Sequence, residues 1–126
     1  MQIMLKLKKI RLTLCSTLSA VCLLEASGSM AQNVLESSKV TRILNDSENF
    51  GQCMALLVPG PEDLAIGCAV NWVTFSCDGT FSSKSLAQQK FSSAQLAYVT
   101  EGNVRVVVDQ TKKHNGYCFA ERIDNI

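Results

Sequence analysis

The sequence predicts a mainly β domain with one helix, in the order strand, strand, strand, helix, strand, strand. Three observations support this prediction. Short apolar runs rich in β-branched residues recur along the chain, and turn-forming residues separate them. One later segment repeats apolar residues at helical spacing instead. Four cysteines lie in residues 32–126, enough to stabilise a small domain with two disulfides.

Residues 1–31 have the three parts of a secretory signal peptide. A positively charged head precedes an almost uncharged apolar run at 12–24, and a small, polar stretch ends at Ala31. A helix over that run would span about 20 Å, less than the ~30 Å hydrocarbon core of a membrane. We therefore expect cleavage after Ala31, export to the periplasm or beyond the cell, and no stable membrane insertion. A retained membrane anchor and lipidation at Cys22 are the alternatives.

Residues 32–126 are expected to form a single disulfide-stabilised domain. They carry eight Lys and Arg against ten Asp and Glu, a net charge of −2. Proteins that bind nucleic acids gain affinity by neutralising phosphates, so this balance argues against a nucleic-acid partner. The four cysteines have no Cys-x-x-Cys spacing, which favours disulfides over a zinc site in an exported chain. The sequence predicts no metal and no cofactor.

The first three strands are expected before residue 78. Residues 34–45 are extended, and turn-forming residues at 45–47 lead into a second apolar run at 50–58. Prolines and a glycine at 59–61 interrupt this run, because proline cannot donate a backbone hydrogen bond. A third run follows at 64–77, rich in β-branched and aromatic residues.

The helix is expected over residues 84–100. Ala87, Phe91, Ala94 and Tyr98 recur at steps of four, three and four, which places them on one helix face. We therefore expect Tyr98 in the core. Ser82 or Ser83 is suited to cap the start, and the Gly102–Asn103 pair lies where the end is expected.

The last two strands are expected at residues 104–109 and 117–123, joined by a hairpin. Asn115–Gly116 is the strongest hairpin signal in the chain, because both central residues of a type I′ turn need positive φ. Five strands with a helix between the third and fourth is the order of an OB-fold, a small Greek-key barrel. A five-stranded open sheet with the helix on one face is the alternative.

The predicted strand pairing favours the disulfides Cys53–Cys68 and Cys77–Cys118. Cys53 and Cys68 lie at equal distances from the proline-glycine tip at 59–61, so they would face each other across that hairpin. Directly opposed residues bring their Cβ atoms to ~4.5–5.5 Å, close to disulfide range. The pairing of Cys53 with Cys77 and of Cys68 with Cys118 is the alternative.

His114, the only histidine, lies beside Lys112 and Lys113 at the predicted hairpin tip. A single histidine supplies at most one metal ligand, and no Gly-x-Ser-x-Gly motif offers it a nucleophile. We therefore predict no catalytic residues and expect a solvated turn. Its basic side chains are candidate binding residues.

Trp72, the only tryptophan, is a further candidate binding residue. On an extended strand it shares one face with Val70 and Thr74, opposite Val73 and Phe75. The pattern does not distinguish the core face from the outer face. Trp72 is therefore either part of the core or an exposed surface for stacking against a sugar or another subunit.

Two resemblances bear on function. The strings WVTFSC (72–77) and KHNGYC (113–118) resemble a family of small exported bacterial proteins without an assigned activity. Gly67-Cys68-Ala69, the expected helix and the segment GNVRV (102–106) are similar, in topology, to receptor-binding B subunits of pentameric bacterial toxins. That second resemblance implies a disulfide-bonded OB-fold and leaves a homo-oligomer open. It carries over no binding residue.

The sequence thus predicts an exported, non-enzymatic binding module that recognises a glycan or a protein through loops and one sheet face. A version similar to toxin B subunits is included in this prediction. An envelope protein-interaction or inhibitor module is the alternative, and a small hydrolase ranks third.

Overall fold

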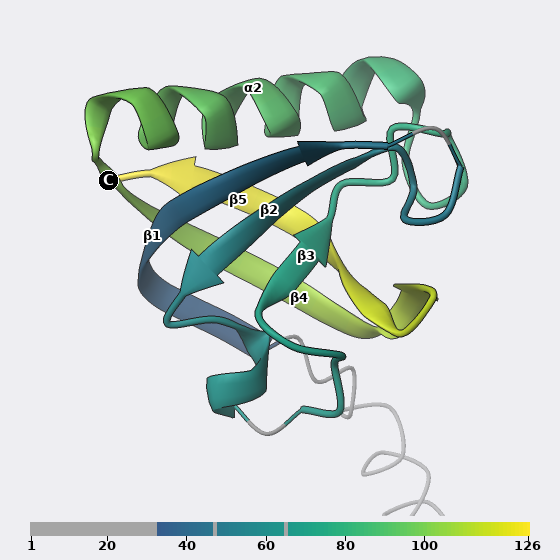
Figure 1. The fold of residues 1–126 in the computed structure, drawn as a ribbon, viewed down its shortest axis with the longest axis horizontal. Helices are drawn as coiled ribbons and strands as arrows, with labels where there is room; N and C mark the ends of the chain where they lie inside the picture. The colour runs from purple at the N-terminus through teal and green to yellow at the C-terminus, as the bar shows by residue number, and fades with distance from the viewer. Residues whose placement is uncertain (1–32, 47, 65) are drawn as a thin grey trace, which may run out of the picture. The chain divides into compact units, whose positions relative to one another are not determined.

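The computed structural model describes residues 33–46, 48–64 and 66–126, so the predicted signal peptide at 1–31 lies outside the described residues. The described residues form a closed five-stranded barrel with one helix (Figure 1). The order around the barrel is β1-β2-β3-β5-β4, and β1 pairs with both β2 and β4. This closure confirms the predicted OB-fold-like barrel over the open sheet.

The element order is strand, strand, strand, helix, strand, strand, as predicted. Neighbouring strands are antiparallel except β3 and β5, which run parallel and pair at two positions. The elements are β1 (Asn33–Asn45), β2 (Cys53–Val58), the 3-10 helix η1 (Pro61–Leu64), β3 (Trp72–Thr74), α2 (Lys84–Thr100), β4 (Asn103–His114) and β5 (Tyr117–Asn125).

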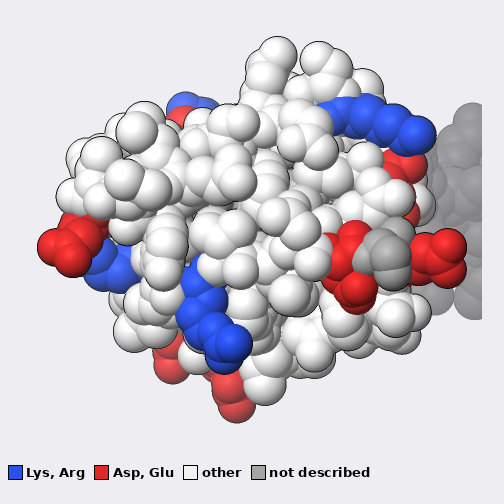
Figure 2. All heavy atoms as spheres, turned by 45° about the horizontal axis from the view of Figure 1, so that its top comes forward, with Lys and Arg blue, Asp and Glu red and all other residues white. Residues whose placement is uncertain are grey.

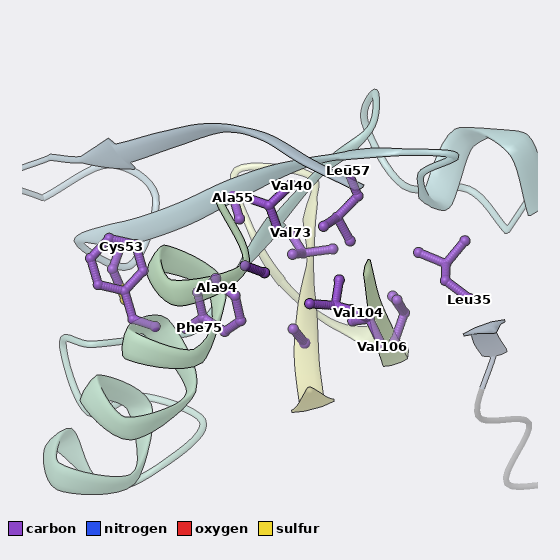
Figure 3. Packing of buried hydrophobic residues seen from close by; sticks show 14 of the residues in the cluster. Leu35, Val40, Cys53, Ala55, Leu57, Val73, Phe75, Ala94, Val104 and Val106 are labelled. Carbon is purple, nitrogen blue, oxygen red and sulfur yellow. The ribbon is translucent and has the colours of Figure 1, made fainter. Parts of the chain in front are cut away.

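The core fills the barrel interior with side chains that alternate along the strands. Leu57, Val73 and Val106 are fully buried and converge from three strands (Figure 3). Helix α2 lies across one end of the barrel (Figure 1). The rings of Phe75 and Phe91 meet there, with centroids 5.9 Å apart. The apolar helix face therefore closes the core at that end.

Helix α2 has the predicted bounds, and Ser83 caps it by accepting a hydrogen bond from the Leu86 amide at 3.2 Å. The prediction that Tyr98 is core is wrong: it is 49% exposed, and Ala97 is buried instead. Three turns of about 3.6 residues from Ala87 end between these two residues, and the smaller side chain faces the barrel. The outer helix face carries no charge after Lys84, and Figure 2 shows a largely uncharged surface when this end is brought forward.

Lys90 joins the helix to β5, beyond the two positions at which β5 pairs with β3. The buried Lys90 ammonium donates to both carbonyls, at 3.2 and 3.0 Å, and lies 4.4 Å from the Phe119 ring centroid. Burial lowers the pKa of Lys90, and the nearby Glu121 opposes this shift. A buried cation thus ties the helix to two backbone carbonyls of β5.

The third strand is much shorter than the predicted run at 64–77. The segment after β2 folds into η1, where Asp63 accepts a hydrogen bond from the Gly60 amide at 2.7 Å. Gly67 and Val70 then adopt positive φ, +74° and +49°, which an extended strand does not allow. Cys68 therefore lies in a loop, and β3 begins only at Trp72.

The favoured disulfide pairing was wrong, and the alternative is correct: Cys53 bonds Cys77, and Cys68 bonds Cys118. The reason is the register of β2 with β3, which pairs Met54 with Thr74 rather than centring on the proline-glycine tip. Cys53 consequently lies near the end of β3, within reach of Cys77. The prediction of two disulfides from four cysteines is confirmed.

The hairpin between β4 and β5 is confirmed, with φ values of +54° at Asn115 and +85° at Gly116. Strand β4 also extends past the predicted end at 109, through a large irregularity. Residues 110–112 have no partners on β5 between the pairs Asp109–Phe119 and Lys113–Cys118. This bulge changes the directions in which the hairpin residues point.

No helix in the described part of the chain is both long and apolar enough to cross a membrane.

Candidate functional site

A small pocket lies on the outer face of the barrel, between strands β1, β2 and β3 and the loops beside them. Its volume is about 140 Å³, and it is lined by Leu44, Phe50, Met54, Trp72 and Tyr117. All five are large apolar or aromatic side chains. The structure thus places Trp72, one of the predicted binding residues, at the wall of a cavity.

Strand alternation explains why these side chains face outward. Cys53, Ala55 and Leu57 of β2 belong to the core, so Met54 between them points to the opposite face. Met54 pairs with Leu44 of the neighbouring strand β1. Val73 belongs to the core, so its neighbour Trp72 points to the outer face. Trp72 is therefore on the outer face and half-buried, which settles the alternative left open by its sequence pattern.

The β1–β2 loop and the start of β5 supply the aromatic side of the pocket. Phe50 comes from the β1–β2 loop and Tyr117 from the start of β5, and their rings meet edge to face with centroids 5.2 Å apart. The side-chain amide of Asn115 donates a hydrogen bond to the Asn49 carbonyl at 3.2 Å, which ties the β4–β5 turn to the β1–β2 loop. The adjacent Cys118 is held by its disulfide. These three contacts tie the aromatic side of the pocket to its neighbours.

Arg42 lies beside Trp72, one of the lining residues, and shares the outer face of β1 with Leu44. Its guanidinium carbon is 5.7 Å from the centroid of the Trp72 ring, within the range of a cation–π contact. The residue itself is exposed. Both members of this pair therefore remain accessible on one surface.

His114 is not among the residues that line the pocket, and it lies next to Gly51 of the β1–β2 loop. Its ring is packed against Phe81, with centroids 4.7 Å apart, and its side chain is only 15% exposed. Its Nε2 atom is 3.0 Å from the Ser76 hydroxyl and 3.5 Å from Asp78 Oδ1. The prediction of a solvated turn residue was therefore wrong for His114, because its ring packs against the segment that follows β3.

The other hydrogen bonds of Ser76 determine which atom donates in the bond between Ser76 Oγ and His114 Nε2. Its hydroxyl donates to Asp78 Oδ1 at 2.8 Å and accepts from the Phe81 amide at 3.1 Å. A hydroxyl has one proton and two lone pairs, so the remaining bond must come from His114 Nε2–H. His114 is then a donor to Ser76 and does not remove its proton. Ser76 is also fully buried, so this trio does not present a nucleophile to a substrate.

The other two predicted basic residues point elsewhere. The Lys112 ammonium lies 3.4 Å from the Asp109 carboxylate and 5.7 Å from the Phe119 ring. Lys113 donates to the Gly67 carbonyl at 2.8 Å. Three consecutive residues thus contact three different neighbours, and the structure does not bring them together as one basic surface.

The carboxylate of Asp78 has a lowered pKa. Burial alone raises it, but hydrogen bonds from the Thr80 amide, the Ser76 hydroxyl and the Thr80 hydroxyl, with the nearby His114, outweigh burial. The folded state therefore favours the charged carboxylate. Its stabilising contribution is present above the ordinary pKa of 3.8 and is lost as the pH falls through the lower folded pKa.

Asp78→Asn is expected to lower the free energy of unfolding by about 1–2 kcal/mol at neutral pH, because it weakens charge-assisted hydrogen bonds. The difference from the unmodified protein should shrink below pH ~4, where the unmodified protein loses the same contribution. Urea unfolding from pH ~7 to pH ~2 measures this. The pKa of Asp109 is also lowered, but that residue is present in both proteins and cancels. A difference that stays constant with pH would contradict the assignment.

Sequence reasoning identified Trp72 but missed the rest of the pocket. Phe50 follows a predicted turn and Tyr117 follows the Asn-Gly pair, so aromatic residues at loop ends were the available signal. Leu44 and Met54 gave no signal of their own, because their orientation depends on strand register. Within the described ranges, no three His, Cys, Asp or Glu side chains gather as a set of metal ligands.

Comparisons of the chain with models of known protein families, with curated proteins and with solved structures find no match. The two family resemblances therefore stay predictions from the sequence.

Proposed function

We propose that this chain is an exported, non-enzymatic binding module that recognises a glycan or a protein through the outer face of β1, β2 and β3. The observation that carries the proposal is the aromatic pocket on that face. OB-folds bind oligosaccharides and oligonucleotides on the face of strands 2 and 3, between the β1–β2 and β4–β5 loops. Phe50 comes from the β1–β2 loop, and Tyr117 is the first residue of β5, directly after the β4–β5 turn. The net charge of −2 disfavours the oligonucleotide.

The two disulfides support the exported part of the proposal. Disulfides persist in oxidising compartments and are rare in the cytosol. Periplasmic and extracellular destinations both agree with this chemistry.

Trp72→Ala tests the proposal on a glycan array and on a displayed peptide library. We expect the loss of Trp72 to weaken the binding of any selected ligand about 30-fold, the effect of removing an aromatic hot spot. Tyr98→Ala is the matched control, because Tyr98 is an exposed aromatic residue on α2 outside the pocket. Binding that Tyr98→Ala weakens and Trp72→Ala spares would place the site elsewhere.

The apolar lining of the pocket favours the alternative in which the partner is an envelope protein. Tryptophan, tyrosine and arginine are the residues most enriched among binding hot spots between proteins. The version similar to a toxin B subunit requires a homo-oligomer that binds a glycan. Light scattering combined with the glycan array tests that version, and a monomer without glycan binding would exclude it.

A further inference from the structure

We propose that the pocket receives one apolar side chain of a protein partner and that Arg42 pairs with a carboxylate beside that side chain. This inference rests on the proposed function of the same face and defines the chemistry of its ligand. It commits to an acidic protein segment rather than to a glycan.

The size and lining of the pocket favour a side chain. Ligand sites for drug-sized molecules usually enclose ~300–1,000 Å³, whereas this pocket has about 140 Å³, room for one ring or one branched aliphatic group. Among its lining residues, only Trp72 and Tyr117 carry a strong hydrogen-bond donor. A sugar ring buried here would leave hydroxyl groups unpaired, at a cost that an apolar side chain does not incur.

Arg42 indicates the charge of the partner group that would lie beside the bound side chain. Among the described arginines, Arg105 and Arg122 each form ion pairs, at 2.9 Å to Glu36 and 3.0 Å to Asp124. Arg42 has no carboxylate within 4.0 Å among the described residues. Its planar guanidinium offers paired donors that match a carboxylate. Arg42 therefore complements an acidic group on the partner.

The rigidity of the pocket adds to this inference. The Phe50–Tyr117 contact, the Asn115–Asn49 hydrogen bond and the disulfide at Cys118 hold the aromatic side in place. A pre-organised site loses little conformational entropy on binding, so a short segment with one anchor side chain suffices for measurable affinity.

Selection from a displayed random-peptide library tests the inference. The bait is the full chain expressed with export, so that both disulfides form, and the Trp72→Ala variant removes peptides that bind elsewhere. Arg42 lies 5.7 Å from the Trp72 ring, about two residues of an extended peptide. We therefore expect the selected peptides to place an aromatic or branched apolar residue within about two positions of Asp or Glu.

Arg42→Gln should weaken a selected peptide about tenfold and reduce the salt dependence of its binding. Replacing the peptide's Asp by Asn, or its Glu by Gln, should weaken its binding to the unmodified protein by the same factor. The same replacement should hardly change its binding to the Arg42→Gln variant. Arg122→Gln is the matched control, because Arg122 is exposed and already paired with Asp124. It should leave the affinity unchanged.

The outcomes separate this inference from the proposed function. Selected peptides without acidic residues, or unchanged affinity in Arg42→Gln, would overturn the inference. Trp72-dependent binding to glycans without peptide binding would also overturn it but would retain the proposed binding face. If neither library contains a ligand that depends on Trp72, the proposed function itself fails.

Discussion

Replacing Cys68 and Cys118 together by alanine is expected to lower the free energy of unfolding by about 4 kcal/mol. The two residues are 50 positions apart, and this disulfide restricts a loop of that length in the unfolded chain. The loss of that restriction raises the entropy of the unfolded state. Proteins of this size have total stabilities of about 5–15 kcal/mol, so the variant is expected to be marginal.

The second disulfide is the natural control for the first. Cys53 and Cys77 are 24 positions apart, and their removal should cost slightly less, about 3.5 kcal/mol. Guanidinium unfolding of both double variants measures the two losses. The loop around Cys68 also keeps two contacts to the hairpin, from Ala69 to the Gly116 carbonyl and from Lys113 to the Gly67 carbonyl. These contacts belong to the folded state, so a loss below ~1 kcal/mol would contradict the mechanism by which the disulfide restricts the unfolded chain.

Gly51→Ala is expected to lower the free energy of unfolding by about 2–4 kcal/mol. Gly51 has a φ of +74°, where an L-residue is strained by about 1 kcal/mol or more. A Cβ atom there would lie 2.6 Å from Thr74 Oγ1 and 2.7 Å from His114 Cδ2, and such overpacking costs about 1–3 kcal/mol. The clash would displace the β1–β2 loop, and with it Phe50, which lines the pocket.

Gly67→Ala is the matched control for this variant. Gly67 has the same φ, +74°, but no atom lies within 4 Å of the position of its Cβ. It should therefore show only the backbone cost, about 1 kcal/mol. Urea unfolding of the two variants separates backbone strain from packing against His114. Equal losses in both would show that the surroundings of Gly51 relax and that His114 does not constrain this loop.

The helix and the hairpin were predictable because they depend on local chemistry. Helix α2 begins and ends where apolar spacing and a serine cap indicated. The Asn115–Gly116 turn follows from the tolerance of these residues for positive φ. Both features need only residues that are close in the sequence.

The third strand and the disulfide pairing were not predictable in the same way. An apolar run such as 64–77 suits a buried strand or an ordered loop equally well. Here the backbone turns at Gly67 and Val70 shorten β3, shift its register against β2 and exchange the disulfide partners. Register arises between strands, so its energy is not contained in either segment alone.

By itself, the sequence determined the mainly β class, the order of strands and helix along the chain, the helix bounds and the presence of two disulfides. Only the tertiary structure decided that Trp72 faces outward beside Arg42 and that His114 faces inward toward Ser76. The physical reason is that each orientation depends on residues distant in the sequence. Trp72 is placed by the β2–β3 register, and the His114 ring packs against Ser76, 38 positions away. The candidate site therefore lies on a sheet face, whereas the conspicuous basic residues lie at the end of β4, next to a turn.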